Sequence, residues 1–181
     1  LNIKYVSNKI RNPLNPEGGW YISLSSSLYG TIFGGEKHFY KIQGEYRKYI
    51  KVLYKNVFAF RMFAGYIYNL DESYKLGHIY LFDIGGQTSL RGWSSPKDYD
   101  PNGALINDMI NLEFRFPIRK KIGGEFFIDC GRLYNEINLF TSTQISWDYG
   151  IGLIYNTTLG PIRIDIGFPY GDLQQAQLHA S

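Results

Sequence analysis

The sequence has little of what a soluble enzyme or a helical membrane protein usually carries. Its 181 residues contain a single cysteine, Cys130, so no disulfide can form within the chain. No apolar run approaches the ~18 residues of a transmembrane helix, so none is expected. The three histidines, His38, His78 and His179, are far apart and show no metal-ligand spacing. These absences argue against a disulfide framework, a helical membrane span and a metal centre.

Charge and catalytic motifs are also scarce. The net charge is only +3, and the densest basic run, residues 119–121, is too short to suggest a nucleic-acid partner. Neither a P-loop nor a dinucleotide glycine motif is present. Glu113, Asp129 and Asp148 could supply carboxylates for hydrolysis, but no Gly-x-Ser-x-Gly nucleophile motif accompanies them. We therefore predict a protein that is not an enzyme, needs no cofactor and binds no nucleic acid.

Aromatic residues and glycine are abundant, and the chain alternates with a period of two. Aromatic residues make up 17% of the chain, with 16 tyrosines and 12 phenylalanines, and there are also 20 glycines. This composition favours strands and tight turns. About nine strands are predicted, most of them ~9–11 residues long, which is the length that crosses a bilayer at a tilt. They lie near residues 3–5, 20–28, 40–50, 58–66, 110–116, 126–130, 147–155 and 162–168, and from Gln177 onward.

The two faces of these strands differ in a way that bears on the architecture. Trp147, Tyr149 and Ile151 share one face, whereas Asp148 and Gly150 share the other. A soluble sandwich also alternates, because its apolar face forms a core and its polar face meets water. A large membrane barrel instead turns bulky apolar side chains toward lipid and polar ones toward a wet lumen. Large aromatics opposite charges, glycine and serine favour the barrel, while composition alone leaves the sandwich open.

The alternation stops between Asn69 and Ala104. This stretch is long for a hairpin connection, and long irregular segments in compact domains are usually functional. Its centre, residues 82–93, reads Phe-Asp-Ile-Gly-Gly-Gln-Thr-Ser-Leu-Arg-Gly-Trp. We therefore look for the function of the chain in this loop.

Residues 85–93, Gly-Gly-Gln-Thr-Ser-Leu-Arg-Gly-Trp, resemble the sixth extracellular loop of the BamA/TamA insertase superfamily, also called the bacterial surface antigen family. The family signature is a Gly-Gly pair, a short spacer, and then Val or Leu, Arg, Gly and an aromatic residue. Residues 7–11 depart from the family, which often has Asp-x-Arg-Asp there. Further segments match family motifs in the same order along the chain. They are residues 12–20, 111–117, 126–131 and 160–169.

The resemblance implies an all-β fold, a transmembrane antiparallel β-barrel with sixteen strands. The strands of this chain would be roughly the eighth to the sixteenth, so residues 1–181 are expected to form the C-terminal portion of the barrel. Residues 70–104 would be a long extracellular loop that folds into the lumen. Periplasmic POTRA repeats and the first half of the barrel would lie upstream of Leu1, where no signal peptide is visible. The last strand is expected to be incomplete at Ser181.

The function implied by the resemblance is assembly of the bacterial outer membrane, by a barrel that folds and inserts other β-barrel proteins. Its partners would be outer-membrane lipid and lipopolysaccharide, unfolded outer-membrane proteins as substrates, and accessory assembly lipoproteins. Other functions stay open: a two-partner secretion translocator that exports a polypeptide, the barrel anchor of a patatin-like lipase, and a general porin. A porin gives no reason for the Arg-Gly-Trp loop. Upstream domains would discriminate among these functions.

Arg91 is the residue of the loop motif with the sharpest expected role. By alternation, Glu113 and Asp129 fall on the polar, lumen-facing side of their strands, and the resemblance implies that they pair with the loop arginine. The planar guanidinium suits such a site because it can hold two carboxylates in fixed geometry. The alternative is a solvated loop arginine. Leu90 belongs to the same motif, and Trp93 is expected to anchor the tip against the lumen side, or else to join an aromatic girdle.

The glycines of the motif have a conformational role in either case. Gly85, Gly86 and Gly92 allow positive φ and a close approach of the loop backbone to the wall. Gly150, Gly152 and Gly167 are predicted on the lumen face, where they would give strand curvature or room for the loop. No catalytic residue and no metal ligand is assigned.

Overall fold

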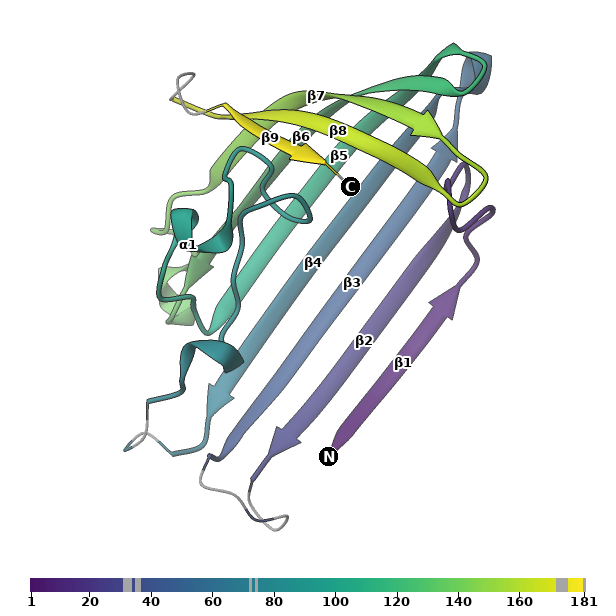
Figure 1. The fold of residues 1–181 in the computed structure, drawn as a ribbon. Coiled ribbons are helices and arrows are strands. Elements are labelled where there is room, and N and C mark those ends of the chain that lie inside the picture. Colours follow the sequence, from purple (N-terminus) through teal and green to yellow (C-terminus); the bar gives the residue numbers. More distant parts are fainter. Residues whose placement is uncertain (31–33, 35–36, 72, 74, 172–175, 181) are drawn as a thin grey trace.

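In the part of the chain that the structure describes, nine strands form one antiparallel sheet in which each strand pairs with the next (Figure 1). The computed structural model describes residues 1–30, 34, 37–71, 73, 75–171 and 176–180. The strand order from β1 to β9 confirms the predicted all-β class and the predicted number of strands. The strands are β1 (Asn2–Asn8), β2 (Gly19–Tyr29), β3 (Phe39–Lys51), β4 (Val57–Asn69), β5 (Ile106–Arg119), β6 (Ile122–Tyr134), β7 (Ser146–Asn156), β8 (Pro161–Pro169) and β9 (Gln177–Ala180).

Helical structure in the described residues is confined to short turns. The α-helix α1 (Pro96–Tyr99) and the 3-10 turn η3 (His78–Tyr80) lie in the connection between β4 and β5. The 3-10 turns η2 (Leu53–Lys55) and η4 (Ile137–Phe140) lie in two other connections. Over the part of the chain that the structure describes, no helix has the length and apolar character needed to span a membrane.

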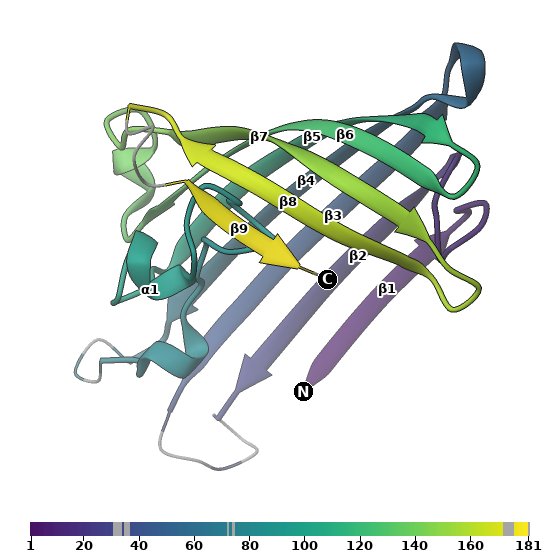
Figure 2. The same ribbon diagram turned by 45° about the horizontal axis from the view of Figure 1, so that its top comes forward.

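The sheet curls so that its two faces meet different surroundings. β7, β8 and β9 bend over the rest of the sheet (Figure 2). Residues 70–105 between β4 and β5 are here called the long loop, and their described part lies on the side toward which the sheet curves. This side is called the inner face. Phe126 and Ile151 are about half exposed on the outer face, whereas Asp129 and Asp148 are fully buried on the inner face. The alternation therefore places apolar groups outside and charges inside, the reverse of a soluble sandwich.

β5 begins at Ile106, earlier than the start near Ile110 that the alternation predicted. The prediction was wrong because the pattern inverts at this end of the strand. Met109, at an inner position, is apolar and buried, while Asp108, at an outer position, forms an ion pair with Arg132 of β6 at 3.0 Å. The sequence pattern thus detects only the part of the strand whose outer face is apolar.

The register of the central strands lines up polar side chains in a row across the inner face. Arg47 of β3 is opposite Arg61 of β4, and Arg61 is opposite Asn111 of β5. Asn111 is opposite Asp129 of β6, which in turn is opposite Asp148 of β7. The row is therefore basic over β3 and β4 and acidic over β6 and β7. The site described below lies over the acidic part of this row.

An apolar cluster holds the base of the long loop on the inner face. Phe39 of β3, Ile67 of β4 and Phe82 of the loop are almost fully buried together. The backbone of Phe82 exchanges two hydrogen bonds with Ala104, at 2.8 and 2.9 Å. Its ring lies over Gly65 of β4, where any Cβ atom would overlap it. Burial of this aromatic surface fixes the place on the inner face of the sheet from which the loop extends.

Candidate functional site

The tip of the long loop, residues 85–93, closes on itself. The N–H of Gly86 donates to the carbonyl oxygens of Leu90 at 3.0 Å and of Trp93 at 2.9 Å. Gly85 and Gly86 have φ angles of +118° and +87°, which glycine adopts without the steric cost that a Cβ atom would add. Leu90 is completely buried. The tip is therefore a preformed unit with one apolar anchor.

Arg91 extends from the tip into a group of carboxylates on the inner face. Its Nε donates to Oδ2 of Asp129 at 2.8 Å and its Nη2 donates to Oδ1 at 2.9 Å, which makes a bidentate pair. Its Nη1 lies 3.2 Å from Oε1 of Glu113 and 3.2 Å from Oε1 of Glu125. Its guanidinium carbon lies 3.6 Å from the centroid of the Phe127 ring. The structure thus brings Arg91 together with Glu113 and Asp129, the two carboxylates that sequence reasoning paired with it.

The group of carboxylates is larger than the sequence suggested. Oδ2 of Asp165 lies 3.8 Å from Nη1 of Arg91, and Oδ2 of Asp148 accepts the N–H of Gly92 at 2.8 Å. Two further guanidinium groups, from side chains on the inner face of the sheet, contact the same carboxylates. Buried carboxylates need such cations, because an unpaired charge in this position is costly. The carboxylates, here called the carboxylate cluster, are Glu113, Glu125, Asp129, Asp148 and Asp165, and the cations are Arg91, Arg115 and Arg163.

Burial and charge act in opposite directions on Arg91. Burial by itself would lower the pKa of the guanidinium, but the hydrogen bond and charge of Asp129 raise it, and the charges of Glu113 and Glu125 add to this effect. The net result is a pKa raised above its ordinary value. Arg91 is therefore a permanent cation, although only 4% of its surface is exposed.

Two glycines allow the loop backbone to touch the wall. A Cβ atom on Gly167 of β8 would overlap the carbonyl oxygen of Arg91. A Cβ atom on Gly92 would lie 2.6 Å from Cβ of Asp148 and 2.8 Å from the backbone nitrogen of Pro169. Gly167 therefore makes room for the loop, which is one of the two roles predicted for it.

Two other contacts of the site take a form that the sequence did not indicate. The ring of Trp93 packs edge-on against Tyr99 of α1, with centroids 5.2 Å apart, and the Tyr99 hydroxyl donates to Oγ of Ser146 on β7 at 3.0 Å. Trp93 thus reaches the wall through the helix of its own loop. The space above Gly150 is filled by the ring of Phe127. Gly150 therefore accommodates the wall side chain on which the loop arginine stacks.

The last strand of the sheet also reaches the loop tip. Nε2 of His179 on β9 lies 3.0 Å from the carbonyl oxygen of Arg91. The register places His179 opposite Asp165 of β8, on the inner face. Arg91 therefore contacts β6 through its side chain and β9 through its backbone.

Replacing His179 with alanine should loosen β9 from the loop tip while Arg91 stays paired with Asp129. The loss of one hydrogen bond costs about 0.5–1.5 kcal/mol, so amide hydrogen exchange in β9 of the intact protein should become up to about tenfold faster. His179→Gln keeps a donor nitrogen and should retain most of the protection. Equal exchange rates in the alanine variant and the wild type would show that the contact does not hold β9.

Sequence reasoning missed several members of the site. Asn111 donates from Nδ2 to Oδ1 of Asp129 at 2.8 Å, and Glu125 and Asp165 belong to the carboxylate cluster. Asp148 was considered only as one carboxylate of a hydrolytic set and not as a contact of the loop tip. The alternation does place all of them on the polar face. What it lacks is the register between strands, which decides which polar positions lie at the height of the loop tip.

Comparisons with known proteins show a match to a protein family and a similarity to a solved structure. A protein-family model described as the Omp85 superfamily domain matches residues 1–179. Among solved structures, the chain is similar to the crystal structure of BamA from Haemophilus ducreyi lacking POTRA domains 1–3, with a TM-score of 0.77 and 17% sequence identity. The match covers 98% of this chain and 40% of the BamA chain, so the chain spans less than half of that relative. At this identity the likeness concerns the fold, and the matched fold is that of a transmembrane β-barrel.

Proposed function

The chain belongs to the Omp85 superfamily, and on this premise we propose that it is part of a barrel that folds and inserts other β-barrel proteins. Its strands form part of an antiparallel barrel in the bacterial outer membrane, with apolar side chains on the outer face and charges on the inner face. The observation that carries the proposal is the docked loop tip with Arg91 buried among carboxylates. A simple pore needs a polar inner wall, but it has no need of such a loop.

The long loop is proposed to be extracellular and to fold into the lumen, where the Arg91–Asp129 pair sets its position. Buried ion pairs contribute little net stability, but removal of one partner leaves a costly unpaired charge. The pair therefore specifies where the tip sits, whereas the backbone hydrogen bonds of the sheet hold the wall together. This division of roles suits a loop whose position matters for function.

The proposed mechanism is strand addition, which needs no catalytic residue, cofactor or ATP. An exposed strand edge presents unpaired N–H and C=O groups, to which an incoming strand can add by β-augmentation. We propose that β9, which follows β8 in the sheet, forms one side of the opening seam.

Unfolded outer-membrane proteins are the proposed substrates of this seam. Outer-membrane lipid and lipopolysaccharide are the proposed surroundings of the outer face, and accessory assembly lipoproteins are proposed partners. The apolar outer face supports the lipid contact, because side chains such as Phe126, Ile151 and Ile164 are about half exposed there. The lipoproteins and the lipopolysaccharide follow from the proposed function rather than from a particular contact.

Depletion of the intact protein in its own bacterium should lower the folded amounts of many outer-membrane barrels together. An insertase acts on the whole class of barrels, so the expected loss is several-fold and general. It is measured by heat-modifiability and quantitative mass spectrometry of the outer-membrane fraction. The wild-type gene should restore the levels, as should a variant with Arg119, the exposed last residue of β5, changed to glutamine.

Two other outcomes of the depletion would overturn the proposal. Loss of one secreted protein, with barrel levels unchanged, would indicate a two-partner secretion translocator. Loss of a lipase activity at the membrane, again with barrel levels unchanged, would indicate a lipase anchor.

A further inference from the structure

The basic half of the inner face holds two arginines in a like-charge register. Arg47 of β3 and Arg61 of β4 are directly opposite each other, an arrangement that is unfavourable for equal charges on neighbouring strands. Both donate from Nε to the same oxygen, Oε1 of Glu45, at 2.9 and 2.5 Å. One carboxylate therefore serves two guanidinium groups, and the three side chains together keep a positive charge.

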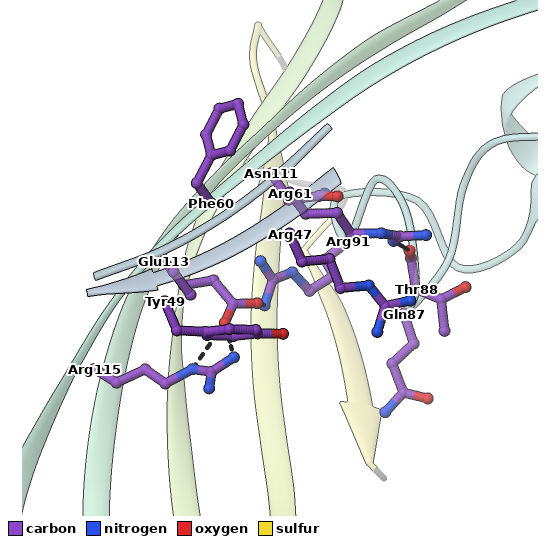
Figure 3. A pocket seen from close by; sticks show the side chains of 11 residues that line it. Arg47, Tyr49, Phe60, Arg61, Gln87, Thr88, Arg91, Asn111, Glu113 and Arg115 are labelled. Atoms are coloured by element: carbon purple, nitrogen blue, oxygen red, sulfur yellow. Dashed lines mark hydrogen bonds and ion pairs between the residues drawn. The ribbon is translucent and has the colours of Figure 1, made fainter. Parts of the chain in front are cut away.

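A cavity of about 260 Å³ lies beside this pair, between the inner face of β3 to β5 and the loop tip (Figure 3). Arg47 extends toward Gln87 of the tip, and Arg61 donates from Nη1 to the carbonyl oxygen of Thr88. Arg115 and its partner Glu113 line the cavity from β5. A water molecule takes up roughly 30 Å³ in the liquid. The space therefore suits a small anionic group together with some water.

Two buried donors on the cavity wall have no partner among the described protein atoms. They are Nε2 of Gln87 and Nη1 of Arg115; the Nε and Nη2 atoms of Arg115 are already bonded to Glu113. A buried donor without an acceptor costs free energy, so such groups normally meet a ligand or ordered water. Oδ1 of Asn111 is a buried acceptor without a partner on the same wall. It suits a ligand that also carries an O–H, as hydrogen phosphate does.

We propose that this cavity binds an oxyanion, a phosphate or carboxylate group, between Arg47, Arg61 and Gln87. Guanidinium groups match the geometry of oxyanions, and an added anion would relieve the repulsion between Arg47 and Arg61. The proposal goes beyond the assembly function and does not depend on it. Because the cavity is lined by inner-face residues, lipid headgroups at the outer face are not the source. The oxyanion comes from the aqueous lumen, as a free ion or as an acidic side chain of a polypeptide.

Inorganic phosphate is the probe for the first test, with the intact protein in phosphate-free detergent micelles. The ³¹P resonance of phosphate should broaden in a saturable way. Arg47→Gln and Arg61→Gln should each weaken this binding at least tenfold, whereas Arg119→Gln, which removes the exposed arginine at the end of β5, should leave it unchanged. Binding that survives in both cavity variants would overturn the proposal.

A blocked peptide with one glutamate, compared with its glutamine counterpart, separates the two sources of the oxyanion. Displacement of phosphate by the glutamate peptide alone assigns the site to carboxylates of a polypeptide. Lack of displacement by either peptide, with phosphate bound, assigns it to a free ion. Equal displacement by both peptides would contradict an oxyanion site.

A variant with a built-in carboxylate tests the site without added ligand. Gln87→Glu places the anion on the loop tip, so it should exclude phosphate and slow proteolysis of the long loop at least several-fold. Gln87→Leu, which has similar size but no charge, should not slow proteolysis. Faster cleavage of the glutamate variant than of the wild type, or undiminished phosphate binding, would rule out the proposed site.

Discussion

Replacing Arg91 with alanine is expected to release the loop tip from the inner face while the nine-stranded sheet still forms. The substitution leaves Asp129, which is fully buried, without its bidentate partner. Breaking a buried ion pair in this way costs about 3–5 kcal/mol, which corresponds to a drop of roughly 10²–10⁴-fold in the ratio of docked to undocked loop. The sheet persists because strand pairing involves no atom of the Arg91 side chain. We expect the variant to insert normally and to fail in the depletion assay described above.

Protease cleavage of the long loop in intact cells measures this release directly, and heat-modifiability reports whether the barrel has formed. Arg91→Lys keeps the charge but loses the planar fork, so it should give intermediate protection. Asp129→Arg reverses the charge of the partner and should expose the loop as fully as Arg91→Ala. A loop that stays protected in the alanine variant, or a variant that sustains normal assembly, would refute the proposed positioning role.

The second large effect is expected from Gly167→Ala, which should displace the loop with every charge still in place. The added Cβ atom would overlap the carbonyl oxygen of Arg91, so the backbone of the tip must move away from β8. Overpacking of this kind costs about 1–3 kcal/mol, and the shift also lengthens the contact between Arg91 and Asp129. Protease sensitivity of the long loop should therefore rise by roughly tenfold or more.

Gly18→Ala is the matched control for this experiment. The nearest atom to a Cβ on Gly18 is Cδ of Arg11, at 3.9 Å, which is ordinary van der Waals contact. The control should show wild-type protection of the loop. If Gly167→Ala is equally protected, the close approach of the loop backbone to β8 is not what holds the tip.

Much of the fold could be predicted because contact with lipid forces the outer face to be apolar. For β7 the alternation predicted residues 147–155, and the strand runs from Ser146 to Asn156. The prediction failed at the start of β5, because an ion pair on the outer face and a buried methionine on the inner face remove the alternation there. Strand ends that leave the apolar zone are set by pairing with neighbours, which a single sequence does not display.

The site was predictable only in part, and for a related reason. The loop motif, together with the position of Glu113 and Asp129 on the polar face of their strands, predicted two of the carboxylates that Arg91 contacts. The alternation treats all polar positions of one face alike, so it could not select Glu125 or Asp165 from that face. Which polar residues contact the tip depends on which residue of each strand lies next to it, and this is fixed by the register between the strands.

The pattern of connections in this sheet has a consequence for the order in which the protein folds. Each strand neighbours the one before it in sequence, so hairpins can close one after another at a small entropic cost. The docked tip differs, because its contacts extend from Arg61 of β4 to His179 of β9, and His179 follows Arg91 by 88 residues. The full set of tip contacts, which includes the hydrogen bond of His179, is complete only when β9 has paired with β8. Full protection of the long loop from protease is therefore expected as a late event in a folding time course.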